Sequence, residues 1–562
     1  YQYDENGQVI DNNFDYIRSL RVISSDDMMN WTDHGEIKVA GEDGAAKWAA
    51  HSWAPAIAYK QIDGKDKFFL YFANDASGIG VLEGDSPLGP WKDPIGKALI
   101  TGQTPGCQGV VWCFDPAVLV DDDGSAYIYF GGGVPNGQQI SPKTARVAKL
   151  GADMISIDGE AELIDAPCMF EDSGIFKYNG KYYYNYCTNF ISPHGDGGPG
   201  YGTICYMESD DPMGPYTYKG EIFQNPANWF GVGGNNHHAT FVFEGQSYFI
   251  YHAQTVSKEL GIEKGYRSTH IDKISFYSNG SIKPIKGTYA GISQLREVSA
   301  YDRIEAETIA WNKGIKVSAC KENGGAFGQF NRQLTDLQDG DWTSVSQVAF
   351  GEKGAKSFTA NVASAKGGKI EIRLDSPQGS LIGTLDVEAT GSADTFKALT
   401  CDVDRVTGTR NVFLVFRGSG TDSIMNVDYY LFGEASTDPV EPEPADTSKL
   451  SAKIKDAENL LEVLSAAEKT KLQAAINTAK AVLNKEKVSQ EEVDAALAAL
   501  SKSVEAAKES LKPQKPNYGA YLNKSFTTKD GLKWKITKCS EKTKEVSLTG
   551  AAKQLTKATI PS

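Results

Sequence analysis

Three stretches with a shared pattern occur in the first half of the chain: VISSDDMMNWTD (22–33), VLEGDSPLGPWKD (81–93) and YMESDDPMGPYT (206–217). Each one joins the end of an apolar strand to an acidic or Ser-rich turn, followed by Gly-Pro or Asn and an aromatic residue. The first two copies lie about 60 residues apart, and the third follows after about two such periods. Repetition at a fixed spacing indicates one supersecondary unit that is used several times.

Aromatic strands accompany these stretches in the same phase: KFFLYFA (67–73), AYIYFGG (126–132), KYYYNYC (181–187) and SYFIYHA (247–253). They end at Gly, Asn or Ser, as buried strands do. Units of about four strands at this spacing predict a β-propeller. We count four full units between residues 50 and 290 and the tail of an earlier unit in residues 1–40. The expected fold is therefore a five-bladed propeller whose first blade is incomplete.

The rest of the chain changes character three times after this propeller, which is expected over residues 1–295. Residues 300–435 contain alternating strands and predict a β-sandwich. Residues 436–448 are acidic and Pro-rich, which predicts an extended linker. Residues 449–512 carry Ala, Lys, Glu and Leu at helical spacing and predict a small antiparallel helical bundle. Short β segments follow in residues 517–562, so the whole chain is expected to be mostly β.

Composition narrows the class of function. The 562 residues carry a formal net charge of −15, which argues against binding to nucleic acid because phosphates need a basic surface. No apolar run is long enough to span a bilayer. The 26 Tyr, 24 Phe and 9 Trp residues favour both β-strands and surfaces that stack on sugars. This balance suits a neutral polysaccharide as the partner.

The cysteines and the chain ends bear on the protein's surroundings. The eight cysteines show no CxxC pair and no metal-like spacing, so we expect buried thiols. A single bridge between Cys107 and Cys113 is the alternative. The chain opens at Tyr1 without a signal-peptide pattern and stops mid-pattern at Ser562. We therefore expect that the natural protein extends beyond both ends.

Two segments place a carboxyl group at the entry to a predicted inner strand. Asp115 precedes Pro116 and a buried strand, whereas Asp121–Asp123 follow that strand and are typical turn residues. Glu171 lies among Met, Phe and Ile, a setting that raises the pKa of a carboxyl group and suits a general acid. Glycoside hydrolysis needs one protonated and one ionised carboxyl group. The alternatives are a turn-starting role for Asp115 and an ion pair with an arginine for Glu171.

Residues 1–295 resemble glycoside hydrolase family 43, which consists of five-bladed propellers that act with inversion. The resemblance rests on SWAP, FDPAV with DDDG, FEDSG with NGKYYY, GGNNHHATF, YHAQTV and GYRS. The run WAPAIAYKQIDGKDKFFLYFA resembles the arabinoxylan arabinofuranohydrolases of that family. The resemblance implies that Glu171 is the general acid and that Asp115 modulates its pKa. The family's general base is an Asp on the first strand of blade one, and since no residue here matches it, we expect it upstream of Tyr1.

The same resemblance implies a substrate site and a metal. Substrate contacts are expected from Trp53, Trp112, Phe190, Asn236 and Arg267. His237 is expected to point into the propeller axis and to help hold a hydrated calcium ion. Zinc is disfavoured because His237 and His238 are adjacent and would point to opposite faces of a strand. His252 is expected to be a core histidine with satisfied hydrogen bonds, and no organic cofactor is expected.

Residues 300–435 resemble carbohydrate-binding module family 6 through the motifs RIEAE, DGDWTSV and NVDYYLF. This implies a structural calcium ion held by carboxylate oxygens of Glu305, Glu307 and Asp428. Sugar binding by this module stays open, with Trp342 either a sugar platform or a core residue. Residues 449–512 resemble the FIVAR modules of bacterial surface proteins, and the last segment resembles surface-protein repeats.

Together these features predict an inverting glycoside hydrolase that releases α-L-arabinofuranose side groups from arabinoxylan. We expect a secreted or cell-wall-associated monomer that attaches through its C-terminal modules. A β-xylosidase or arabinanase of the same family is one alternative, because a fold does not fix a substrate. A non-catalytic surface glycan-binding protein is the other. The C-terminal modules favour attachment, whereas Asp115 and Glu171 favour catalysis.

Overall fold

The computed structural model divides the chain into two compact units, Tyr1–Ala435 and Ser436–Ser562. The residues that it describes are 2–321, 330–420, 423–433, 446–485, 488–511, 524–527, 533–539 and 544–550. The two units are treated separately below. Strands predominate over helices in the described residues, so the prediction of a mostly β chain is confirmed.

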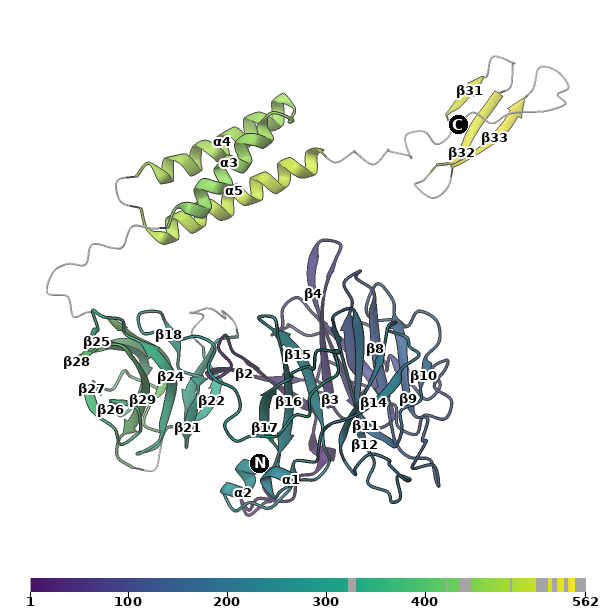
Figure 1. Ribbon diagram of the computed structural model, residues 1–562. Coiled ribbons are helices and arrows are strands. Elements are labelled where there is room, and N and C mark those ends of the chain that lie inside the picture. The colour runs from purple at the N-terminus through teal and green to yellow at the C-terminus, as the bar shows by residue number, and fades with distance from the viewer. Residues whose placement is uncertain are drawn as a thin grey trace. The chain divides into compact units, whose positions relative to one another are not determined.

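The first part of unit one contains five small antiparallel sheets within the described residues (Figure 1). The first sheet is β1 (Ser19–Ser24), β2 (Trp31–Lys38) and β20 (Thr308–Ile309). The second is β3 (Trp53–Ile62), β4 (Lys65–Asn74), β5 (Gly78–Gly84) and β6 (Ile100–Thr101). The third is β7 (Ala117–Val120), β8 (Ala126–Gly131), β9 (Ala145–Leu150) and β10 (Glu162–Ile164). The fourth is β11 (Met169–Tyr178), β12 (Lys181–Thr188), β13 (Ile204–Ser209) and β14 (Thr217–Phe223), and the fifth is β15 (His238–Phe243), β16 (Gln246–Ala253) and β17 (Ser268–Lys273).

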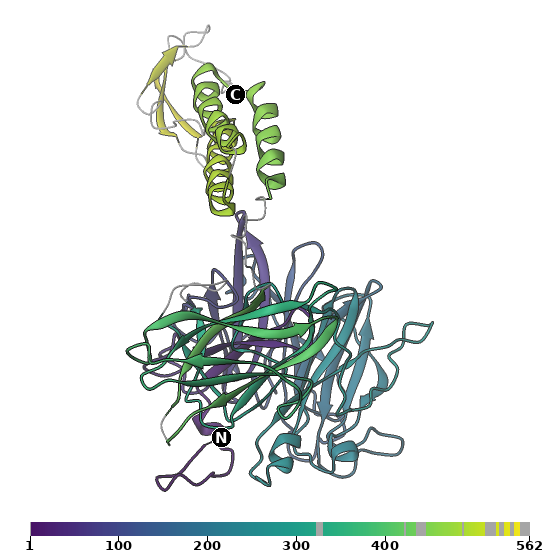
Figure 2. The ribbon, with the colours of Figure 1, turned by 90° about the vertical axis from the view of Figure 1, so that its left-hand side faces the viewer.

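The five sheets surround a common centre, and we call them the ring. Each sheet, or the segment that leads into it, contributes a side chain to one shared cavity; in chain order these include Leu20, Trp53, Asp115, Glu171 and His238. Short helical turns lie between the strands: η1 (Phe14–Tyr16), α1 (Ala227–Phe230) and α2 (Thr255–Glu259). The hairpin of β3 and β4 rises beyond the neighbouring sheets (Figure 2).

The repeated sequence stretches occupy equivalent places in the ring. Residues 81–93 leave the end of β5, the third strand of its sheet, and residues 206–217 connect the third strand β13 to the fourth strand β14. Gly89 and Gly214 in these turns have φ angles of 96° and 101°, a left-handed region that favours glycine. Residues 22–33 connect β1 to β2. By this register, β1 and β2 correspond to the third and fourth strands of the other sheets.

A β-sandwich follows in the same unit. One sheet contains β18 (Val298–Ser299), β21 (Trp311–Lys313), β24 (Trp342–Ala349), β26 (Gly368–Leu374), β27 (Leu381–Val387) and β29 (Thr409–Arg417). The other contains β19 (Ile304–Glu305), β22 (Lys316–Ala319), β23 (Arg332–Thr335), β25 (Ala355–Ala363), β28 (Phe396–Val406) and β30 (Asn426–Gly433). Alternate residues of the strands point inward, and Val345, Phe358 and Leu414 belong to one shared apolar core.

The sandwich is joined to the ring by a shared sheet and by buried hydrogen bonds. Strand β20 pairs with β2, with Trp31 opposite Ile309. The Asn30 side chain is buried and bonds to the backbone of Ser346 in both directions, at 3.1 and 2.7 Å. Arg332 Nε donates to the carbonyl of His34 at 2.8 Å. These contacts make the sandwich part of the structure that supports the first sheet.

Unit two contains α3 (Ser448–Leu461), α4 (Ala466–Leu483) and α5 (Gln490–Leu511), followed by the small sheet β31 (Ser525–Thr527), β32 (Lys533–Cys539) and β33 (Lys544–Gly550). Ser465 and Ser489 accept hydrogen bonds from the backbone N–H groups of Glu468 and Glu492 at the starts of α4 and α5. Among the helices described, none combines the length and apolar character needed to cross a bilayer. Most of the predicted linker lies outside the described residues.

Candidate active site

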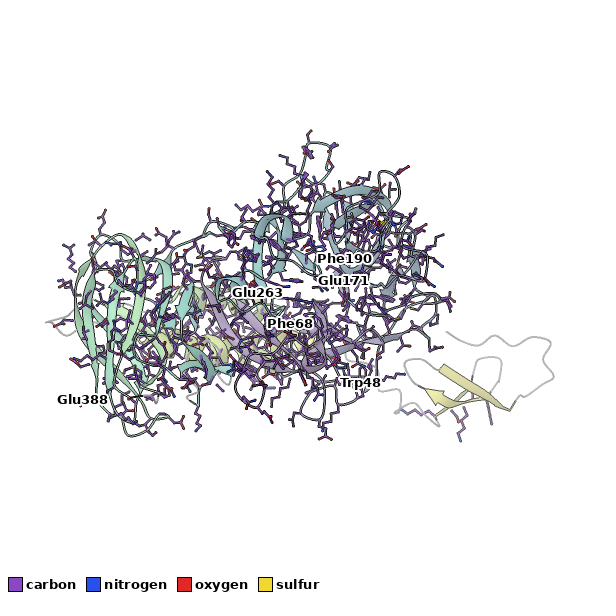
Figure 3. The ribbon with its side chains drawn as sticks, turned by 90° about the horizontal axis from the view of Figure 1, so that it is seen from below. Trp48, Phe68, Glu171, Phe190, Glu263 and Glu388 are labelled. Carbon is purple, nitrogen blue, oxygen red and sulfur yellow. The ribbon has the colours of Figure 1, made fainter. Side chains whose placement is uncertain are left out.

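A cavity of about 520 Å³ opens at the centre of the ring. Its apolar lining residues include Ile17, Leu20, Ala54, Ala239 and Ile250. Its ionisable lining residues include Asp115, Glu171, His237 and Arg267. Predicted site residues from sequence positions more than 150 residues apart therefore meet in one place. Figure 3, a view from below, labels Glu171 and Phe190 close to one another in the ring.

The backbone turns the acidic side chains into the cavity wall. Asp115 and Asp172 have φ angles of 49° and 71°, a left-handed conformation that costs energy for residues other than glycine and that often marks functional sites. The pairing of β11 with β12 shifts register on both sides of Glu171, as β-bulges do when they redirect a side chain. The backbone N–H of Asp172 donates to Asp115 Oδ2 at 3.0 Å. This bond fixes the orientation of the Asp115 carboxyl group.

Glu171 has the surroundings of a proton donor. Its side chain is 8% exposed, and burial, followed by the charge of Asp115, raises its pKa to about 8. His237 opposes this shift. Burial likewise raises the pKa of Asp115. Glu171 Oε1 is buried without a hydrogen-bond partner among the described residues, so it is placed to bond with a molecule in the cavity.

Neither of the alternative roles for these two residues matches the structure. Asp115 lies in the cavity wall and is 4% exposed, unlike a turn-starting residue at the surface. Within the described part of the chain, Glu171 forms no ion pair with an arginine; the ion pairs of the ring involve other carboxylates. The two carboxyl groups are therefore available for chemistry in the cavity.

The adjacent histidines are both tied to Asp172. His238 Nδ1 lies 2.6 Å from Asp172 Oδ2, and His237 Nε2 lies 3.2 Å from Asp172 Oδ1. His237 Nδ1 also lies 3.8 Å from Asp115 Oδ2. Burial disfavours the charged form of His237, but the carboxylates of Asp172 and Asp115 outweigh it and raise the pKa. The two carboxylates thus favour the charged form of His237.

The hydrated calcium ion predicted at His237 stays a prediction. Both ring nitrogens of His237 face carboxylate oxygens. In the described part of the chain, no group of three or more His, Cys, Asp or Glu side chains is arranged to hold a metal ion, but an ion held mainly by water does not require such a group. The contacts of His237 help to position Asp115 and Asp172, and no step below depends on a metal in the ring.

Trp53 and Arg267 line the cavity as predicted. Arg267 Nη2 donates to Asn235 Oδ1 at 3.1 Å, and its guanidinium group lies 5.1 Å from the centre of the Phe14 ring. Trp53 Nε1 donates to the carbonyl of Phe14 at 3.0 Å. Phe14 also lines the cavity, which could not be predicted because it stands in a polar loop.

The predicted residues Trp112 and Phe190 belong to an aromatic row beside the cavity. The Trp112 ring lies 5.3 Å from that of Phe170, which lies 5.7 Å from that of Phe190, and both contacts are edge-to-face. Phe190 is 45% exposed, so the row offers a surface outside the cavity. Asn236 is fully buried and donates to the carbonyl of Gly202 at 3.0 Å. Its predicted contact with sugar stays a prediction.

Asp172 and His252 were not recognised as site residues from the sequence. Asp172 is the partner of both histidines and of Asp115, and only its position beside Glu171 could have suggested it. The prediction that His252 is a satisfied core histidine is wrong. It lines the cavity, and neither ring nitrogen has a hydrogen-bond partner among the described residues. The reason is that β16, which carries His252, lines the cavity even though it is the second strand of its sheet.

The sandwich contains the second group of predicted metal ligands. Glu307 is fully buried, and neither of its carboxyl oxygens has a hydrogen-bond partner among the described residues. Burial, followed by the charges of Glu305 and Asp428, raises the pKa of Glu307 to about 8. A hard cation could stabilise such an unpaired buried carboxyl group, but the three carboxyl groups are not arranged as a metal-binding group in the described part of the chain, so this calcium site stays a prediction. Glu305 is held by Arg303 at 2.8 Å, and Asp428 accepts hydrogen bonds from two asparagines.

Comparison with known proteins agrees with this geometry. The model of "Glycosyl hydrolases family 43" matches residues 2–282, and that of "Carbohydrate binding module (family 6)" matches residues 305–434. The arabinoxylan arabinofuranohydrolase of Paenibacillus polymyxa is 53% identical over 443 residues, which cover 77% of this chain and 69% of that protein. The protein of the same name from Bacillus subtilis (strain 168) is 54% identical over 445 residues, covering 77% of this chain and 86% of that protein.

A solved structure shows the same similarity in three dimensions. The crystal structure of a glycoside hydrolase family 43 arabinoxylan arabinofuranohydrolase from Bacillus subtilis, in complex with cellotetraose, superposes with a TM-score of 0.75. It is 54% identical, and the match covers 77% of this chain and 91% of that one. The match extends over the ring and the sandwich together, which the two family models divide between them. The chain therefore belongs to glycosyl hydrolase family 43 and carries a family 6 carbohydrate-binding module after its catalytic part.

Proposed function

We propose that this protein releases α-L-arabinofuranose side groups from arabinoxylan by hydrolysis with inversion. The observation that carries the proposal is a buried carboxyl group with a raised pKa, Glu171, in the central cavity. More than half of the aligned residues are shared with two arabinoxylan arabinofuranohydrolases, over the ring and the sandwich. The family alone leaves the substrate open, whereas this degree of identity favours arabinoxylan.

In the proposed mechanism, Glu171 gives its proton to the glycosidic oxygen as the bond to the arabinose breaks. Asp115 helps to keep Glu171 protonated before the reaction through its negative charge. Asp172 and His237 hold Asp115 in place through the contacts described above. Arg267, anchored by Asn235, is placed to donate hydrogen bonds to a sugar in the cavity.

Inversion also needs an ionised carboxylate that activates water on the opposite face of the sugar. Among the described residues that line the cavity, the carboxyl groups are Asp115 and Glu171. They lie on adjacent sheets, and the charge of Asp115 raises the pKa of Glu171, which favours the role of pKa modulator over that of base for Asp115. The base is therefore a further group.

We propose that this base is an Asp on an inner strand of the first blade, as the resemblance to family 43 implies. The repeat register makes β1 and β2 the third and fourth strands of their sheet, so a complete blade would add two strands at the free edge of β1. Leu20 of β1 and Ile250 of β16 are apolar lining residues of the cavity against which such a strand could pack. The ring would then have five complete blades.

The experiment for the acid compares Glu171→Gln with the surface variant Glu160→Gln, in a catalytically active form of the protein. Hydrolysis of arabinoxylan should fall by about 10²–10⁴-fold in Glu171→Gln. The loss should be much smaller on an aryl arabinofuranoside with an acidic leaving group, which needs little protonation. Equal losses on the two substrates would contradict general acid catalysis by Glu171.

The identity of the product tests the alternatives. Proton NMR of the reaction should show free arabinose, first as the inverted anomer, and a xylan chain of unchanged length. Release of xylose or shortening of the chain would favour the xylosidase or arabinanase alternative. Binding of arabinoxylan without any turnover would favour the glycan-binding alternative.

We also propose roles for the remaining parts of the chain. Residues 300–435 would hold a calcium ion, with Glu307 as the ligand best supported by its unpaired oxygens. The helices α3–α5 would form a FIVAR-like module over residues 449–512, and residues 517–562 would begin a surface-protein repeat. These modules would attach a secreted, monomeric enzyme to the cell wall.

A further inference from the structure

Phe14 is an exposed aromatic residue at the edge of the central cavity. Its side chain is 41% exposed and lies in the short η1 turn of an otherwise polar loop. The ring meets that of Trp53 edge-to-face at 6.0 Å, and the guanidinium group of Arg267 lies 5.1 Å from its centre. Phe14 thus connects two cavity residues that come from the second and fifth sheets.

The loop that carries Phe14 is fixed on both sides. The N–H of Ser52 donates to the carbonyl of Ile17 at 2.9 Å, and the N–H of Asn12 donates to the carbonyl of Lys264 at 2.8 Å. The Tyr266 hydroxyl accepts from the N–H of Gln2 at 2.7 Å and donates to the carbonyl of Ile10 at 2.9 Å. These bonds hold the Phe14 ring at the rim although it is not buried. A fixed, exposed aromatic face is what a sugar-stacking residue requires.

Two aromatic groups therefore flank the acid on different sides of the ring. Phe14 and Trp53 come from the segments before the first and second sheets. Trp112 and Phe170 come from the entry to the third sheet and from the fourth. Asp115 and Glu171 lie deeper in the cavity. When a side-group sugar reaches Glu171, the polysaccharide chain that bears it stays at the rim of the cavity. The aromatic groups lie at this rim.

We infer that Phe14 is a specificity-determining residue that contacts the main chain of a branched polysaccharide while the side-group sugar occupies the cavity. The inference rests on the proposed function and extends it. It identifies a surface that binds the leaving group, which is the polysaccharide main chain. Apolar faces of pyranose rings stack on aromatic side chains. Phe14 thus favours a polymer over a small substrate whose leaving group is too short to reach it.

The experiment compares Phe14→Ala, Phe14→Trp and the control Tyr16→Ala in a catalytically active form of the protein. Tyr16 belongs to the same η1 turn and is 60% exposed, but it is not among the residues that line the cavity. In Phe14→Ala, kcat/KM on arabinoxylan should fall about tenfold, as expected for the loss of one stacking contact. On an aryl arabinofuranoside it should change less than about twofold. Phe14→Trp should retain activity on the polymer, and Tyr16→Ala should match the wild type on both substrates.

Equal losses on the two substrates would overturn the inference, because they would mean that Phe14 only supports Arg267. Unchanged activity on the polymer would overturn it as well. Calorimetry with a branched xylo-oligosaccharide and the Glu171→Gln protein gives the same comparison without turnover. Adding Phe14→Ala should raise the Kd about tenfold, and an unchanged Kd would count against the inference. Release of xylose instead of arabinose by the wild type would contradict the proposed function. The calorimetric comparison would still show whether Phe14 contacts the polysaccharide main chain.

Discussion

Glu171 and Asp172 are neighbours in the sequence, but their surroundings assign them different tasks. Asp172 accepts hydrogen bonds from the His238 backbone and pairs with the rings of two histidines. Glu171 is buried without such partners for Oε1. Burial without such partners suits the protonated carboxyl group of a general acid. The register shifts beside Glu171 allow two adjacent residues to reach these separate environments.

The pKa of Glu171 predicts the alkaline side of the pH profile. As a general acid, Glu171 must be protonated, so activity should be retained below its pKa of about 8 and lost as the pH rises through it. Hydrolysis of arabinoxylan should decrease about tenfold for each pH unit above that value. A pH profile of kcat/KM checks this, with Glu160→Gln as the control. Persistence of the same alkaline limb in Glu171→Gln would show that another group titrates.

The main carboxyl residues could be predicted from the sequence because local patterns place them. Asp115 and Glu171 each stand at the entry to a recognisable strand, and the apolar neighbours of Glu171 predict its burial. Phe14 and His252 could not be found in this way. Each of them reaches the cavity through contacts with residues distant in sequence, and Phe14 meets Arg267 across more than 250 residues. A short stretch of sequence carries no pattern that predicts contacts between residues so far apart in the chain.

At the scale of elements, the short segment between β19 and β20 concentrates two structural tasks. It carries Glu307, whose carboxyl group is buried and unpaired. Its backbone carbonyl at Glu307 accepts a hydrogen bond from the N–H of Asp33 in β2, at 3.2 Å. The candidate cation site of the sandwich is therefore attached directly to the first sheet of the ring. A change at Glu307 should be transmitted to both.

Calcium should stabilise this segment through Glu307. Without the ion, the raised pKa means that the free energy of unfolding falls as the pH rises from about 4.5, the unfolded value, to about 8. Added calcium should raise the Tm at pH 7 and above by several degrees, because it binds the ionised form in the folded state. Differential scanning calorimetry with and without a chelator measures the shift.

Glu307→Gln provides the matched variant for that measurement. Its Tm should not respond to calcium and should depend less on pH than that of the wild type. In the chelated state at pH 8, the variant should be at least as stable as the wild type, because it buries no charge. A calcium response of the same size in the variant would place the ion elsewhere.

The repeats predicted strands and turns well because each unit is built from local hairpins with a clear apolar pattern. They could not predict β20. This strand is only two residues long, and its partner β2 lies about 270 residues earlier in the chain. Too few side chains are involved to leave a pattern, and the pairing depends on the completed sandwich.

At the scale of the whole molecule, unit one should behave as one structural piece even though two family models divide it. A protein that ends before Val298 would lose β20, the Asn30–Ser346 pair and the Arg332–His34 bond. Three such hydrogen bonds at about 1 kcal/mol each predict a decrease in Tm of roughly 6–12 °C. Calorimetry of the truncated protein tests this.

Truncation after Ala435 is the matched comparison. It removes unit two at a boundary between compact units, so the Tm of unit one and its activity on a soluble aryl arabinofuranoside should remain as in the whole chain. A decrease as large as that caused by the earlier truncation would mean that unit two also supports the ring.

The pairing of β2 with β20 is delayed while the protein is being synthesised. A ribosome adds about 5–20 residues per second, so residue 309 leaves it on the order of tens of seconds after residue 38. For that interval one side of β2 has no neighbour, and an unpaired strand edge is prone to join the wrong chain. The first sheet of the ring is therefore among the last parts of unit one to be completed during synthesis, and protection of this edge by a chaperone would matter most in that window.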